Sequence, residues 1–173
     1  MTIRLGLGIS RFPFDLAIDY WKWVDLCEAG GVDSIWQTDR LVSKEVMLEC
    51  MSTMAALAGH TKKIRFGMNV ASIALRDPLL IAKQCATIDF LSDGRLLPAF
   101  GLGSAFSQDY SATGTLTKKR GKKADEALKL VARLWAENDV SFEGEFYQYQ
   151  GASISPKPSN PNIPLWIGGS SEL

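Results

Sequence analysis

Short apolar runs that suit buried strands alternate along this chain with segments in which apolar residues recur at helical spacing. The predicted strands cover residues 3–9, 32–36, 64–71, 96–102 and 164–169. A helix capped by Asp15, with Leu16 on its apolar face, is predicted to run to Gly30. Further helices are predicted from Met47 to Ala58, after Asp77 on a face formed by Ile81, Cys85, Ile88 and Leu91, and over residues 122–138. Strands that alternate with helices predict a parallel α/β sheet with right-handed crossovers.

The segment after residue 76 shows most clearly how one such repeat is punctuated. Asp77 is a good N-cap, and Pro78 suits the first helical position. Gly94 suits the left-handed residue that ends a helix. The apolar run at 96–102 then predicts a strand that is buried on both faces. Residues 140–149 interrupt the alternation and predict a small hairpin.

Length and composition restrict the class of protein. The chain has 173 residues, which predicts a single domain over 1–173, and its 19 basic residues balance 19 acidic ones. This balance argues against a nucleic-acid partner or a polybasic membrane anchor, and no apolar run is long enough to span a bilayer. Cys27, Cys50 and Cys85 are odd in number and far apart, so buried free thiols and a cytoplasmic location are expected. With His60 as the only histidine, no metal site is predicted.

One long motif carries a family resemblance. It consists of Arg76, Pro78, Ala82, Lys83, Ala86, Thr87, Asp89, Leu91, Ser92, Gly94, Arg95, Gly101 and Gly103, and the run Pro164–Gly169 extends it. The pattern resembles the luciferase-like flavin-dependent oxidoreductases, which include bacterial luciferases, flavin monooxygenases and deazaflavin-dependent reductases. The resemblance implies a TIM-barrel type of (β/α) repeat, in an incomplete barrel of about four βα units plus a fifth strand and a hairpin insertion.

In a barrel of this type the loops after the strands form the active face. The resemblance implies a cis peptide at Asn69-Val70 behind the central flavin ring, and an ordinary strand end is the alternative. Gly101 and Gly103 would let the cofactor approach the backbone, or would only relieve crowding at the strand exit, and Ser104 could donate a hydroxyl hydrogen bond to it.

The last predicted strand opens on Gly168, Gly169 and Ser170. Backbone N–H groups at a strand exit of this kind suit a cofactor phosphate, whereas a frayed tail is the alternative. The basic run at 118–123 either forms a solvated helix start, which is the commoner outcome, or attracts a phosphate tail.

Trp36, Asp39, Arg40 and Phe106 are predicted to line the substrate pocket. Asp39-Arg40 stands where many relatives have an acidic residue followed by histidine, so no catalytic residue is identified. Asp39 either contacts the cofactor or caps its loop. Arg40 either binds an anionic group or forms a surface salt bridge.

The function implied by the resemblance is a monooxygenase that oxidises a small organic substrate with O2 and reduced FMN supplied by a flavin reductase. Two alternatives stay open: a deazaflavin-dependent reductase that transfers hydride, and a truncated, non-catalytic half-barrel that acts as a binding or assembly partner. A homo-oligomer or a complementing chain is expected, because the end strands of the sheet would be unpaired. The chain alone is expected to bind FMN weakly.

Overall fold

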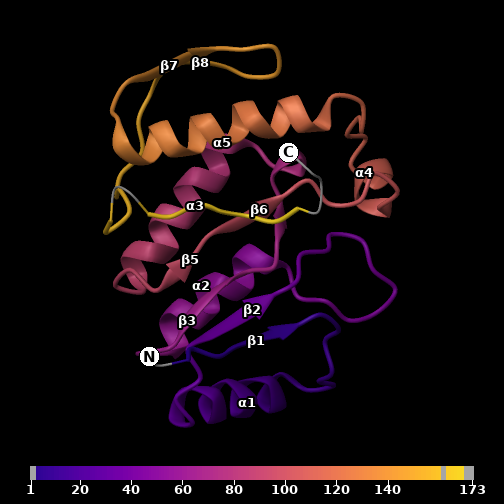
Figure 1. The fold of residues 1–173 in the computed structure, drawn as a ribbon, viewed down its shortest axis with the longest axis vertical. Coiled ribbons are helices and arrows are strands. Elements are labelled where there is room, and N and C mark those ends of the chain that lie inside the picture. Colours follow the sequence, from indigo (N-terminus) through magenta and orange to yellow (C-terminus); the bar gives the residue numbers. More distant parts are fainter. Residues whose placement is uncertain (1–2, 161–162, 170–173) are drawn as a thin grey trace.

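The computed structural model describes residues 3–160 and 163–169 and shows two open parallel sheets. One sheet has the order β1-β2-β3-β5, formed by Gly6–Ile9, Ser34–Gln37, Arg65–Met68 and Leu96–Leu97. The other has the order β4-β6-β9, formed by Ala71–Ser72, Ala99–Gly101 and Trp166–Ile167. All pairs within these two sheets are parallel, as predicted. The described strands do not close into a barrel (Figure 1).

Two predicted strands are each divided into two short ones. The strand predicted at 64–71 ends at Met68 and resumes at Ala71, with the Asn69–Val70 peptide in the cis form between them. The strand predicted at 96–102 is broken at Pro98, which has no N–H to donate to a neighbouring strand. In each case the first half joins one sheet and the second half joins the other.

The helices lie between successive strands along the chain. They are α1 (Ala17–Ala29), α2 (Cys50–His60), α3 (Pro78–Leu91), the short α4 (Gln108–Ala112) and α5 (Arg120–Ala136), with a 3-10 turn η1 at Ile73–Leu75. The antiparallel hairpin of β7 (Val140–Glu143) and β8 (Gln148–Ala152) lies outside α5 (Figure 1). The hairpin was predicted, whereas α4 and η1 were not.

Local signals set some helix ends correctly and others wrongly. The Asp77 carboxylate caps α3 by accepting a hydrogen bond from Leu80 N at 2.9 Å, as predicted. The prediction that Asp15 caps α1 is wrong, because the N-cap is Leu16 and no side chain caps this end. Leu16 is also 61% exposed instead of facing the core. Glu49, which the sequence analysis did not single out, caps α2.

The core fills the space between the two sheets and the helices that cover them. Its largest fully buried side chains include Phe66 on β3, Met54 on α2 and Ile81 on α3. Trp135 on α5 is also buried, and its indole N–H donates to the Ala82 carbonyl of α3 at 3.0 Å. The core therefore fixes the helices against the sheets, and this packing positions the strand ends that lead into the loops of the site.

Two further observations bear on the class of protein. All three cysteines are buried and free, as predicted. Within residues 3–160 and 163–169, no helix is long and apolar enough to cross a membrane.

Candidate functional site

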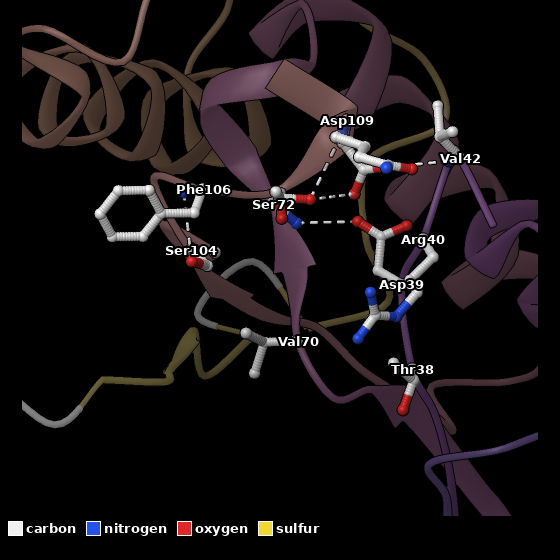
Figure 2. A pocket seen from close by; sticks show the side chains of 12 residues that line it. Thr38, Asp39, Arg40, Val42, Val70, Ser72, Ser104, Phe106 and Asp109 are labelled. Atoms are coloured by element: carbon white, nitrogen blue, oxygen red, sulfur yellow. Dashed lines mark hydrogen bonds between the residues drawn. The ribbon is translucent and has the colours of Figure 1, made fainter. Parts of the chain in front are cut away.

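The carboxyl ends of β2, β4 and β6 converge on a pocket of about 490 Å³. Its wall is formed by Thr38, Asp39 and Arg40 after β2, by Val70 and Ser72 beside β4, and by the loop from Gly103 to Asp109 after β6 (Figure 2). Parallel strands place their carboxyl ends at one edge, so loops far apart in the sequence meet there, as the barrel interpretation predicted. Asp39, Arg40, Phe106, Val70, Gly103 and Ser104 all belong to this wall.

The side chain of Asp39 holds the framework of the pocket. It is 1% exposed, and both of its oxygens accept hydrogen bonds from the guanidinium of Arg76 at 2.7 Å. One oxygen also accepts from Ser72 N at 2.9 Å. Burial alone would lower the pKa of Arg76, but the hydrogen bonds and charge of Asp39 raise it. Of the two roles that the sequence left open for Asp39, the geometry matches the one that caps the loop.

Arg76 also reaches two other groups. Its guanidinium lies 3.4 Å from a carboxylate oxygen of Glu49 and 3.4 Å from the Cys50 sulfur. Asp39, Glu49 and Cys50 present ligand atoms within 4.8 Å of one another, a spacing that would suit a metal ion. The guanidinium hydrogen-bonds to all three residues, so the cation of this cluster is Arg76 itself. Burial raises the pKa of the Cys50 thiol, and the charge of Asp39 adds to the effect.

Asp109 binds the backbone of the loop after β2, on the far side of Arg40 from Asp39. Its carboxylate is buried and accepts hydrogen bonds from Leu41 N at 3.2 Å and Val42 N at 2.7 Å. The hydroxyl of Tyr110 donates to the Leu102 carbonyl at 2.5 Å. This acidic-aromatic pair therefore joins the loop after β2 to the loop after β6. This role could not be predicted from the sequence, because the N–H groups that Asp109 binds are 67 and 68 residues away.

Arg40 lies between Asp39 and the Leu41–Val42 backbone, both of which are held by hydrogen bonds. Its side chain is exposed, and the guanidinium is directed towards the middle of the pocket (Figure 2). Among the described residues it makes no hydrogen bond or ion pair. The surface salt bridge that was one of its two predicted roles is therefore not formed within the described part of the chain.

The side chain of Val70 accounts for the need for glycine at two positions that had suggested cofactor contact. The peptide bond between Asn69 and Val70 is cis, as the resemblance implied. A Cβ atom on Gly101 would lie 2.6 Å from one Val70 methyl, and one on Gly168 would lie 2.8 Å from the other. Both glycines are thus required by the packing of Val70. Gly103 has φ of +66°, which favours glycine, and its bare backbone faces the pocket.

Trp36 lines a different cleft, of about 420 Å³. Its indole N–H donates to Ser34 Oγ at 3.0 Å, and its ring meets Trp166 edge-on at 6.1 Å. Asn69 and Val70 also line this cleft, so Val70 separates it from the pocket that contains Arg40. Phe106 lies on the rim of that pocket, 96% exposed, with its ring turned away from Arg40 (Figure 2).

A third cleft, of about 640 Å³, lies between the start of α5 and the ends of β6 and β9. Gly103, Gly168 and Gly169 contribute bare backbone to it, and Arg120 closes one side. The Nε atom of Arg120 is buried and has no hydrogen-bond partner among the described residues. In the sequence, Arg120 stands out only as part of a basic run. Ser170, predicted as a phosphate contact, lies outside the described residues.

Known proteins of similar sequence include redox enzymes that use a deazaflavin. The F420-dependent glucose-6-phosphate dehydrogenase of Kineococcus radiotolerans is 31% identical over 146 residues, which are 81% of this chain and 43% of that protein. The 5,10-methylenetetrahydromethanopterin reductase of Archaeoglobus fulgidus is 30% identical over 164 residues, which are 95% of this chain and 47% of that protein. This chain therefore spans about half the length of the curated relatives it matches.

Solved structures show the same fold. A monooxygenase from Streptomyces bottropensis superposes with a TM-score of 0.86 at 20% identity, over 95% of this chain and 53% of that one. An F420-dependent secondary alcohol dehydrogenase superposes with a TM-score of 0.83 at 23% identity, over 98% of this chain and 53% of that one. The model of the luciferase-like monooxygenase family matches residues 19–173, nearly the whole chain, and the chain belongs to that family.

Proposed function

We propose that this chain forms the cofactor-binding part of an oxidoreductase that uses a flavin or a deazaflavin. The observation that carries the proposal is the unpartnered Nε of Arg120, buried in a cleft whose other walls include Gly103, Gly168 and Gly169. A buried donor without an acceptor is costly, and phosphate oxygens are suitable acceptors for a guanidinium. Because glycines leave the backbone bare, a phosphate can approach it closely. Apart from Asp125, an acidic residue that also lines the cleft, the residues present therefore fit a cofactor that carries a phosphate.

The other residues that would hold the cofactor lie next to this cleft. Gly103 lines both the cleft that contains Arg120 and the pocket that contains Arg40. Val70 lines both the pocket that contains Arg40 and the cleft that contains Trp36. Ser104 adds a hydroxyl to the pocket wall. Val70 would support the ring system, and Gly103 and Ser104 would contact the chain between the ring and the phosphate. The pocket that contains Arg40 would then receive the substrate.

The proposed reaction is oxidation of a small organic substrate by O2, with reduced FMN delivered by a separate reductase. Bound reduced FMN would supply the electrons for this chemistry. The part of this chain is to bind and to orient. Asp39 and Asp109 fix the loop that carries Arg40, so the substrate pocket is formed before ligands enter. Their carboxylates are occupied by these contacts and are not assigned to proton transfer.

A second candidate is hydride transfer with a deazaflavin. It is favoured by the curated relatives at 30–31% identity, whose names specify F420 dependence or a methanopterin reductase. The phosphate contact at Arg120 is common to both candidates. The cofactor preference of the chain decides between them.

Titration of the purified chain with FMN, riboflavin and F420, followed by fluorescence and calorimetry, tests the proposal. FMN is expected to bind at least about tenfold more tightly than riboflavin, because only FMN offers the phosphate. Arg120→Gln should remove this difference, whereas Lys129→Gln, which removes a charge from an exposed position of the same helix, should preserve it. Tighter binding of F420 than of FMN would favour hydride transfer. Absence of saturable binding of both would overturn the proposal.

A further inference from the structure

We propose that Arg40 recognises an oxyanion of the substrate, so that this site selects small organic acids with a carboxylate or phosphate group. The inference rests on the proposed function, because it assigns a substrate class to the same site. It is carried by three observations: the backbone around Arg40 is fixed, the nearby carboxylates are already bound, and the pocket wall offers further polar and apolar contacts.

The backbone on both sides of Arg40 is held by buried carboxylates. Asp39, the preceding residue, is fixed by Arg76 and Ser72 N. The two following residues, Leu41 and Val42, donate their N–H groups to Asp109. Because the backbone is already fixed, a bound ligand has to order only the side chain of Arg40, which lowers the entropic cost of recognition.

Among the described residues, no carboxylate of the pocket forms an ion pair with Arg40. Both oxygens of Asp39 accept from Arg76, and one oxygen of Asp109 accepts from Leu41 N and Val42 N while the other accepts from the Ser107 hydroxyl at 3.0 Å. Arg40 therefore contributes to this concave site a positive charge that has no ion-pair partner in the described part of the chain. Low-dielectric walls strengthen the field of such a charge, which attracts anionic ligands.

The rest of the wall indicates what else the ligand carries. Ser104 and Gln108 add polar groups, and Val42 and Val70 add apolar surface. A guanidinium fork matches two oxygens of a carboxylate or phosphate. A volume of about 490 Å³ suits a small molecule rather than a peptide or polymer. The ligand class is therefore a small acid with an apolar body.

The anion could belong to the cofactor instead of the substrate, and the geometry distinguishes the two. Arg120 lines the cleft beside α5, whereas Arg40 lines the pocket between β2, β4 and β6. If the cofactor phosphate binds Arg120, the charge of Arg40 is left for a second ligand. We therefore assign Arg40 to the substrate.

The test uses benzoate and benzamide, which have the same size and differ in charge, titrated by calorimetry into the chain without cofactor and with saturating FMN. Wild-type protein is expected to bind benzoate about tenfold or more tightly than benzamide, since a hydrogen bond to a charged group is the stronger kind. Arg40→Gln should remove this preference, and Arg40→Lys should keep part of it. Lys44→Gln, an equal loss of charge from an exposed position of the same loop, should leave it unchanged.

Four results would overturn the inference. They are no saturable benzoate binding to wild type, equal binding of benzoate and benzamide, a preference that survives Arg40→Gln, and a loss of FMN affinity but not of riboflavin affinity in Arg40→Gln. The last result would assign Arg40 to the cofactor phosphate. A chain that prefers benzoate through Arg40 but binds neither FMN nor F420 would contradict the proposed function alone. Unchanged thermal unfolding of Arg40→Gln confirms that the variant is folded.

Discussion

Replacing Asp39 should lower the free energy of unfolding, because the contacts of its side chain hold the pocket together and are not contacts with a ligand. The carboxylate is 1% exposed, its partner Arg76 is 11% exposed, and two N–H donors of the guanidinium lie 2.7 Å from its two oxygens. Removing one partner of a buried pair leaves the other charge uncompensated, so Asp39→Ala should cost about 3–5 kcal/mol of unfolding free energy. Asp39→Asn keeps an acceptor for Ser72 N and should cost less, about 2 kcal/mol.

Among the described residues, the other groups near the Arg76 guanidinium are poor substitutes for Asp39. Glu49 and the Cys50 sulfur are both 3.4 Å from the guanidinium, at the outer limit of a hydrogen bond, and Glu49 is already engaged in capping α2. Arg76→Met should be destabilising for the complementary reason, because it leaves a buried carboxylate. The double variant Asp39→Asn/Arg76→Met should be more stable than the sum of the single effects predicts, by about 1–3 kcal/mol.

Urea unfolding followed by tryptophan fluorescence measures these differences, and FMN titration of the same variants measures binding. Asp15→Asn is the matched control: this exposed acid caps no helix, so its removal should change stability by less than about 0.5 kcal/mol. Two results would contradict a structural role for Asp39: an unchanged unfolding midpoint in Asp39→Asn together with loss of cofactor binding, or single-variant effects that simply add.

Three further changes test other contacts by the same unfolding assay. Gly101→Ala places a Cβ 2.6 Å from a Val70 methyl and should cost about 1–3 kcal/mol, with partial recovery when Val70→Ala is added. Burial alone would raise the pKa of Glu28, but three backbone N–H donors lower it. Glu28→Gln should therefore destabilise the protein most at neutral pH, and the stability difference between variant and wild type should shrink as the pH falls through the folded-state pKa. Burial raises the pKa of Asp89, so wild-type stability should fall as the pH rises from the ordinary aspartate pKa to the raised one, and Asp89→Asn should remove this slope.

Features that depend on neighbouring residues could be predicted from the sequence. Asp77 and Pro78 begin α3, and Gly94 adopts a positive φ after its end, because each acts through its own backbone. The parallel order of strands followed from the alternation of strands and helices. The family resemblance added the cis peptide at Asn69-Val70, which no local rule would have suggested.

Features that depend on distant residues could not be predicted. The role of Asp39 is set by Arg76, 37 residues later, and a polar residue after a strand suits a ligand contact as well as a structural one. Gly101 and Gly168 suggested a bound ligand, whereas the space they leave is filled by Val70. Arg120 is one of several basic residues in a row, and only the fold shows that its Nε is buried without a partner.

The side chains that remain unpaired are therefore a better indication of ligand contacts than the polar residues at the strand ends. A folded protein normally gives each buried charge a partner, as it does here for Asp39 and Asp109. The Nε of Arg120 is buried and has no partner among the described residues; Arg40 also has none, but its side chain is exposed. The two residues line cavities that share Gly103. Because any side chain at 103 would place its Cβ 2.9 Å from Ser72 Oγ, glycine keeps this shared boundary open. Two anionic groups, one on each side of Gly103, would satisfy both guanidinium groups, and a cofactor ring supported by Val70 would then adjoin a substrate in the pocket of Arg40.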